Sequence, residues 1–177
     1  NKVDTLTAFS ELTAVAECII RTAYERTLAH IGGSKPSFAF SVIAVGRLGS
    51  GMMDFGSDLD LIFVYRDADH FSLEAETAER AIRMAQTILS LIGGGGGADK
   101  LYDVDARLRP EGGGSILAIS LSRFRKYLAD RASEWERLAM TRARQVAGNE
   151  RLGGEIEEML AKFAYRRKFT PEEIERI

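Results

Sequence analysis

The stretch that decides the fold is residues 42–65, VIAVGRLGSGMMDFGSDLDLIFVY. It predicts an apolar strand, a glycine-rich turn and a second apolar strand that begins around Asp58-Leu59-Asp60. Because successive side chains of a strand point to opposite faces, Asp58 and Asp60 share one face while Leu59 takes the other. Two carboxylates on one face of an apolar strand are costly unless a cation lies between them. The pattern therefore predicts a hard metal ion such as Mg²⁺ and a phosphoryl- or nucleotidyl-transfer site.

The turn between these strands offers groups that suit a phosphate. Glycines at positions 46, 49 and 51 let backbone N–H groups approach a phosphate closely, and Ser50 and Ser57 can add hydroxyl donors. The spacing differs from that of a P-loop, because no Gly-Lys-Ser/Thr follows. It also differs from a dinucleotide fingerprint, whose third glycine opens a long helix. A tight strand connection is the simpler alternative for these glycines.

A second informative stretch is residues 101–108, LYDVDARL, where apolar and charged side chains alternate. This alternation predicts a strand that is apolar on one face and densely charged on the other, and a solvated outer face is the simpler interpretation of the charged side. Asp105 could supply a third carboxylate if the two strands are neighbours, and Asp103 competes for the same position. Such a set would suit a two-metal site, whose ions lie about 3.5–4 Å apart. Arg107 and Arg109 could balance phosphate charge, since guanidinium groups match phosphate oxygens.

Length and composition narrow the class of protein. The 177 residues fit one domain, or one domain with a helical appendage, and a hydrophobic content of 45% is ordinary for a buried core. A net charge of -2 gives no general attraction for nucleic acid or for a membrane surface. Cys18 alone excludes a disulfide framework and a thiolate zinc site. No apolar run reaches the roughly 18–20 residues of a membrane span, so we expect a cytoplasmic protein. A chain that begins at Asn1 is expected to be a fragment of a longer one.

Residue spacing predicts strands before residue 120 and helices after it. The predicted strands cover residues 38–45, 61–65, 101–108 and 116–119. Before residue 120 the predicted helices are a long one from residue 6 toward Gly32-Gly33 and one over 72–92. After it, a Ser133/Glu136 capping box opens a predicted helix over 133–146, and Gly153-Gly154 separates this helix from one over 155–163. A last helix is predicted to start at Thr170-Pro171. The predicted fold class is α+β, with a catalytic core and its N-terminal helix in residues 1–119 and a helical segment in 120–177.

Three runs in this order, GRLGSGMMDFGSDLDLIFVY, LYDVDARLRP and EWERLAMTRARQVAG, are similar to one nucleotidyltransferase half of the bacterial glutamine synthetase adenylyltransferase/adenylyl-removing enzyme. The resemblance extends over about residues 38–148. It implies the DNA polymerase β-type nucleotidyltransferase fold, a mixed sheet with flanking helices. The site residues that it implies are, as catalytic metal ligands, Asp58, Asp60 and Asp105, and, as nucleotide-binding residues, Gly49, Ser50, Ser57, Arg107 and Arg109.

The resemblance also implies an activity and its partners. One half of such enzymes attaches AMP from ATP to a tyrosine of glutamine synthetase, and the other half removes it with phosphate, which yields ADP. Both reactions use Mg²⁺, expected here as a pair of ions. Glutamine synthetase is the implied protein substrate, and a nitrogen-signalling regulatory protein is an implied partner through parts of the enzyme outside this sequence. No membrane or nucleic-acid partner is expected.

The turn departs from the family pattern at two places. Arg47 stands where the family usually carries a lysine, and Met52-Met53 stand where it carries a Glu-Leu pair. Met52 thus removes a carboxylate, while the three core aspartates are intact. Two alternatives stay open beside the adenylyltransferase hypothesis: a nucleotidyltransferase that acts on a small molecule, and a regulatory module that binds nucleotide without turnover.

Overall fold

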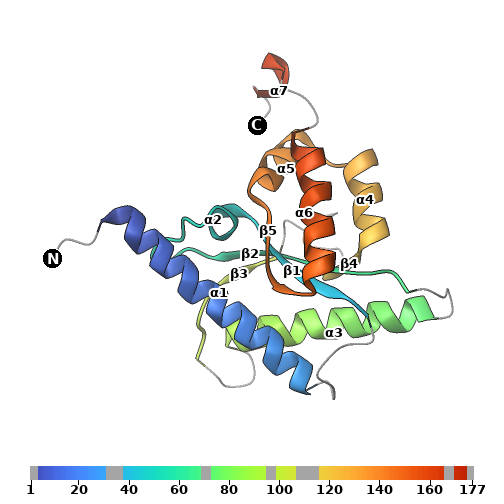
Figure 1. Cartoon of the computed structure of the whole chain (residues 1–177), viewed down its shortest axis with the longest axis horizontal. Helices are drawn as coiled ribbons and strands as arrows, with labels where there is room; N and C mark the ends of the chain where they lie inside the picture. Colours follow the sequence, from blue (N-terminus) through green and yellow to red (C-terminus); the bar gives the residue numbers. More distant parts are fainter. Residues whose placement is uncertain are drawn as a thin grey trace.

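Strand β2 (Leu59–Tyr65) is the centre of a five-stranded sheet (Figure 1). β1 (Phe40–Ala44) pairs antiparallel with one edge of β2, and β5 (Arg144–Gly148) pairs antiparallel with the far edge of β1. On its other edge β2 has two parallel partners in succession, first β3 (Val104–Asp105) and then β4 (Ala118–Ser120). The sheet is therefore mixed. The computed structural model describes residues 4–30, 38–68, 73–94, 99–106, 116–165 and 170–174.

Helices cover both faces of this sheet (Figure 1). The long helix α1 (Thr5–His30) and α3 (Glu74–Gly93) pack on one face. The other face carries α4 (Leu121–Asp130) and α6 (Glu150–Ala164), and α5 (Glu134–Ala139) packs against α6. The remaining short elements are α2 (Gly46–Gly49), the 3₁₀ turn η4 (Met140–Arg142) and α7 (Pro171–Ile174).

The alternation of side chains along β2 divides the core into two clusters. Leu59, Leu61 and Phe63 join the cluster beneath α1 and α3, whereas Ile62 and Val64 join the cluster beneath α4 and α6. All five are buried. A strand that is covered on both faces needs an apolar side chain at every position, which is why the run LIFVY is continuous rather than alternating.

Several predicted elements are confirmed. α1 and α3 occupy the stretches with helical spacing, β1 lies within residues 38–45, and the capping box of Ser133 and Glu136 opens α5. β4 lies close to the predicted 116–119 strand, and α7 begins at Pro171. Within the described residues, the strand predicted over 101–108 is limited to β3. No helix among the described residues has the combination of length and apolar character needed to cross a membrane.

The helix predicted over residues 133–146 is wrong after Ala139. The chain passes through η4 and then forms β5, in which Val146 is buried against the α1 face. The physical reason is long-range: every residue of β1 is buried, so the backbone groups on its free edge must be paired by another strand. Local helical spacing cannot compete with that requirement. The sheet thus extends beyond residue 120, and the predicted division into 1–119 and 120–177 stays a prediction.

The Gly153-Gly154 pair does not separate two helices. α6 runs through both glycines from Glu150, and Asn149 caps it by accepting a hydrogen bond at Oδ1 from Leu152 N, 2.9 Å. A Cβ on Gly153 would lie 2.0 Å from Oε1 of Gln145, so the glycine lets the helix pack closely on β5. Close packing, rather than a helix break, is what this glycine provides.

Candidate active site

Two of the predicted carboxylates come from the start of β2. Leu59 is fully buried and fixes the strand against the α1 face, while Asp60 is partly exposed and Asp58 is exposed just before the strand. Because side chains alternate, anchoring Leu59 in the core directs its two neighbours to the opposite face. The apolar residue between them therefore positions the pair.

The third carboxylate comes from β3, through the register of its pairing with β2. Asp105 is the partner of Asp60 in this parallel pair, and Leu59 N donates to Asp103 O at 2.8 Å. Carboxylate oxygens of Asp58, Asp60 and Asp105 all lie within 4.8 Å of one another. The rival residue Asp103 instead forms an ion pair with Lys100, and its side chain is 75% exposed. Of the two candidates, the structure brings Asp105 into the cluster.

The glycine-rich turn begins directly against this cluster. Gly46 has a φ of +58°, which favours glycine, and a Cβ there would lie 2.0 Å from Oδ2 of Asp60. Val45 N donates to Asp60 O at 3.0 Å, so the backbone of the turn is attached to β2 at the same point. Gly46 is required both for its backbone conformation and for the space that the Asp60 carboxylate occupies.

The other predicted turn residues lie further along the same loop. Gly49 is buried, and a Cβ there would lie 2.2 Å from the carbonyl oxygen of Arg142. Ser50 Oγ donates to Arg47 O at 3.0 Å, and Ser57 Oγ accepts from Asp54 N at 3.0 Å. These contacts give the turn a defined shape. The residues at which the turn departs from the family pattern differ in exposure. Arg47 and Met52 are exposed, whereas Met53 is fully buried.

Arg107 and Arg109 lie outside the described residues, and their role stays a prediction. Sequence reasoning missed two residues of α1 that support the turn, Thr13 and Glu17, and it placed Arg144 on a helix, whereas Arg144 supports the turn from β5. Thr13 Oγ1 accepts from Met53 N at 3.2 Å, and Arg144 donates to carbonyl oxygens of α2. The sequence signal for Thr13 and Glu17 is weak, because it consists only of two polar residues four positions apart in an amphipathic helix. The spacing of that helix predicts core packing alone.

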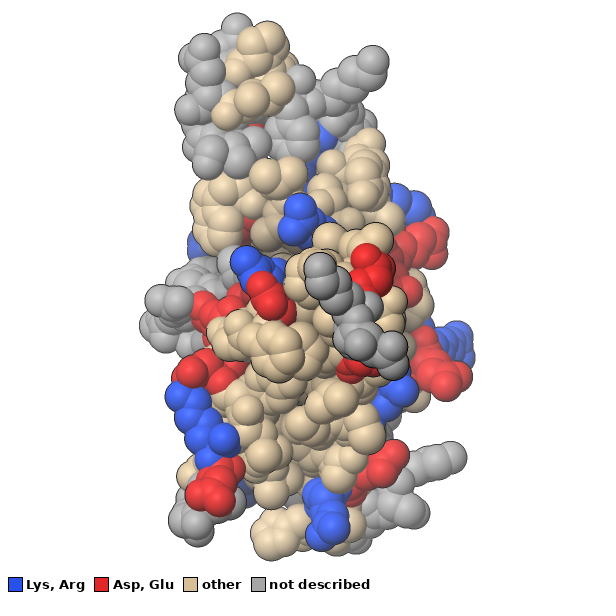
Figure 2. All heavy atoms as spheres, turned by 90° about the vertical axis from the view of Figure 1, so that its left-hand side faces the viewer, with Lys and Arg blue, Asp and Glu red and all other residues tan. Residues whose placement is uncertain are grey.

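The cluster has a clear chemical capacity. Three carboxylates at this separation repel one another when all are ionised, and a divalent cation bound among them removes that cost. Oxygen-only ligands are those that Mg²⁺ prefers, together with phosphate oxygens of a substrate. On the face drawn in Figure 2, the described basic and acidic side chains are interspersed over a largely uncharged surface. Recognition of a phosphate on this face would thus depend on individual groups rather than on a broad basic field.

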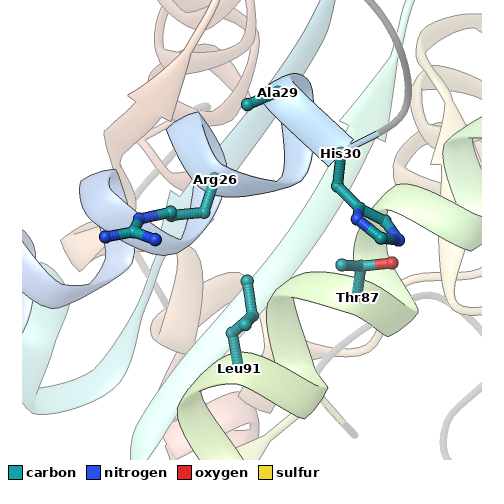
Figure 3. Close-up of a pocket in the computed structure, with 5 residues that line it drawn as sticks. All are labelled: Arg26, Ala29, His30, Thr87 and Leu91. Atoms are coloured by element: carbon teal, nitrogen blue, oxygen red, sulfur yellow. The ribbon is translucent and has the colours of Figure 1, made fainter.

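A cavity of about 460 Å³ lies elsewhere, between the C-terminal part of α1 and α3. Figure 3 shows His30 next to Thr87, Leu91 pointing toward α1, and Arg26 turned away along α1. His30 is about 25 Å along the helix axis from Thr13, at 1.5 Å per residue. Among the predicted site residues that the structure describes, none lines this cavity, so the cavity is separate from the carboxylate cluster.

Comparison with known proteins identifies a family that matches most of the chain. A family model described as glutamate-ammonia ligase adenylyltransferase matches residues 2–159, which include α1, the whole sheet and most of α6. The chain belongs to this family. Its mixed sheet flanked by helices is the core of a polymerase β-type nucleotidyltransferase, as the resemblance implied.

Three relatives of this adenylyltransferase-family chain are each named bifunctional glutamine synthetase adenylyltransferase/adenylyl-removing enzyme. The protein from Xanthomonas campestris pv. campestris is 41% identical over 150 residues, which cover 78% of this chain and 16% of the relative. The protein from Stenotrophomonas maltophilia is 34% identical over 173 residues, which cover 95% of this chain and 19% of the relative. The protein from Rhizobium meliloti is 36% identical over 166 residues, which cover 89% of this chain and 17% of the relative. The chain thus spans less than a fifth of the length of these relatives.

Proposed function

We propose that this chain is the core of one adenylyl-transfer half of an enzyme that moves AMP to or from a tyrosine of glutamine synthetase. The observation that carries the proposal is the group of Asp58, Asp60 and Asp105 carboxylates within 4.8 Å of one another, with Gly46 packed against one of them. Family membership supports the reaction type, and the names of the relatives support glutamine synthetase as the protein substrate.

In the proposed site each group has one role. Asp58, Asp60 and Asp105 would hold Mg²⁺, as a pair of ions, and the ions would supply charge neutralisation at the attacking and leaving oxygens. The turn that contains Gly49, Ser50 and Ser57 binds the phosphates of ATP or ADP. Arg107 and Arg109 follow Asp105 in the chain and balance the remaining phosphate charge. The protein thereby contributes positioning and charge stabilisation rather than a covalent intermediate.

The two directions use the same geometry. In attachment, the tyrosine hydroxyl oxygen forms a bond to the α-phosphorus of ATP, the bond from that phosphorus to the β-phosphate oxygen breaks, and pyrophosphate leaves. In removal, an oxygen of inorganic phosphate bonds to the phosphorus of the tyrosyl-AMP, the bond to the tyrosine oxygen breaks, and ADP leaves. The tyrosine loses a proton in the first direction and regains one in the second.

The test is calorimetric titration of ATP into the chain with and without Mg²⁺, with an Asp58→Asn/Asp60→Asn double variant beside the wild type. We expect Mg²⁺-dependent binding by the wild type and its loss in the variant, because amide oxygens keep the shape but not the charge that attracts the cation. An Asp103→Asn variant is the matched control. It removes a carboxylate near the site that lies outside the cluster, and it should bind as the wild type does.

Two assays then assign the reaction. Transfer of label from α-phosphate-labelled ATP to glutamine synthetase would identify attachment, and phosphate-dependent release of ADP from adenylylated glutamine synthetase would identify removal. Metal-dependent ATP binding without either reaction would favour a regulatory module. If a folded wild type binds no nucleotide in the presence of Mg²⁺, the proposal fails.

A further inference from the structure

The side chain of Arg144, at the start of β5, joins three elements behind the glycine-rich turn. Its Nε donates to Gly49 O and its Nη2 donates to Leu48 O, each at 2.9 Å. The same Nη2 lies 2.6 Å from Oε1 of Glu17 on α1. Leu48 and Gly49 are the last residues of α2, so the guanidinium binds the carbonyl end of that helical turn, where a cation is favourable. The planar guanidinium group can reach two successive carbonyls at once.

α1 holds the same turn at a second point. Thr13 is 6% exposed, accepts a hydrogen bond at Oγ1 from Met53 N, and donates to Phe9 O at 2.7 Å. Thr13 and Glu17 are four residues apart and therefore lie on one side of the helix. α1 thus contacts the turn directly through Thr13 and indirectly through Glu17 and Arg144.

The opposite end of α2 lies against the carboxylate cluster. Gly46 opens α2 next to Asp60, whereas Leu48 and Gly49 end it against Arg144. α2 is a single helical turn of four residues, 46–49. A shift at the carbonyl end of this turn therefore also moves the backbone at its other end, next to the carboxylate cluster, which is only a few ångströms away. Leu48 O accepts from Gly51 N as well, at 3.1 Å, which links Arg144 to the amides that follow α2.

We propose that Arg144, oriented by Glu17, is a positioning residue that fixes the backbone of residues 46–53 for nucleotide binding. The inference deepens the proposed function and depends on it. Arg144 acts on the turn and through it on the nucleotide, and its effect is on phosphate binding rather than on the metal-holding carboxylates, which β2 and β3 position.

Arg21 provides a matched control. Its Nη2 lies 2.7 Å from the other oxygen of Glu17, and its Nε donates to Val146 O at 3.1 Å. Arg21 therefore shares the carboxylate and the strand with Arg144, but it bonds to β5 rather than to the turn. Substitution of either arginine by lysine keeps the positive charge and removes the two-pronged hydrogen bonding.

The experiment compares Arg144→Lys with Arg21→Lys by three measurements: Mn²⁺ affinity without nucleotide, ATP affinity with Mg²⁺, and NMR hydrogen exchange of the Gly49, Ser50 and Gly51 amides. For Arg144→Lys we expect ATP affinity to fall by about tenfold, the free-energy equivalent of one charge-assisted hydrogen bond. We expect faster exchange of those amides and Mn²⁺ affinity within about twofold of the wild type. Arg21→Lys should change none of the three by more than about twofold.

Each contrary result has a distinct meaning. Equal losses of ATP affinity in the two variants, or a loss of Mn²⁺ affinity as large as that of ATP affinity, would overturn the positioning role. A wild type that binds no ATP would overturn the proposed function and this inference with it. If Arg144→Lys does not fold, the Glu17→Gln variant takes its place. This variant keeps the Arg144 guanidinium and removes the carboxylate charge that orients it. Unchanged ATP affinity in Glu17→Gln would overturn the inference.

Discussion

Gly46 combines a backbone conformation that favours glycine with a position directly against the Asp60 carboxylate. Replacement by alanine should lower metal affinity by tenfold or more, because the added Cβ falls 2.0 Å from Oδ2 of Asp60 and must displace that carboxylate. Backbone strain at the positive φ should also cost about 1 kcal/mol of stability. Mn²⁺ titration and thermal unfolding of Gly46→Ala measure the two effects separately.

Gly51 separates strain from displacement in this experiment. Its φ is +72°, and a Cβ there meets nothing within 4 Å. Gly51→Ala should therefore show a similar loss of stability with unchanged Mn²⁺ affinity. If both variants lose metal affinity equally, the contact between Gly46 and Asp60 is not what shapes the site.

At the scale of elements, Asp67 attaches the end of β2 to the first turn of α4. Its carboxylate accepts from Ser122 N at 3.0 Å and also from Ser122 Oγ. Burial raises the pKa of Asp67, but the hydrogen bonds from Ser122 and Ser120 outweigh it, and the pKa is held below its usual value of 3.8. A lowered pKa in the folded state contributes stability above the unfolded value, and this contribution is lost as the pH falls through the folded value.

Asp67→Asn should therefore lower the free energy of unfolding at pH 7. The difference from the wild type should shrink as the pH falls below about 4, where the wild-type carboxylate becomes protonated. The difference between wild type and variant, measured by urea unfolding at several pH values, tests this. Ser122→Ala removes one of the same hydrogen bonds from the donor side and should show the same trend. A difference that stays constant from pH 7 to pH 3 would contradict the prediction.

Elements also show what could be predicted from the sequence. Alternation around Leu59 predicted the shared face of Asp58 and Asp60, because that property is local. The choice between Asp103 and Asp105 needed the register of β3 on β2, which spacing alone does not give. β5 was missed because its pairing with β1 joins residues about a hundred positions apart, and the contact of Arg144 with Glu17 has the same long-range character.

The whole molecule is built around one sheet with a cluster on each face, and we expect the two faces to unfold together. Ile20 is fully buried on the α1 face, whereas Trp135, the only tryptophan, lies on α5, which packs against α6 of the opposite face. Ile20→Ala should cost roughly 2–5 kcal/mol. It should shift the urea midpoint reported by Trp135 fluorescence and by circular dichroism equally.

Phe124→Ala provides the reciprocal variant, since Phe124 is fully buried on the α4 face. It should also move both signals together. Separate midpoints, with Trp135 fluorescence insensitive to Ile20→Ala, would mean that the two faces form independent units and that the sheet does not couple them.

The position of β5 in the chain has a consequence for synthesis on the ribosome. Translation delivers the carboxylates and the glycine-rich turn first, about forty residues or more before Arg144 and the strand that covers β1. Until then one edge of an apolar strand is open, and open edges of this kind pair with other chains. The nascent protein is therefore open to aggregation at this edge until β5 emerges, and completion of the sheet covers the edge and secures the turn in the same step.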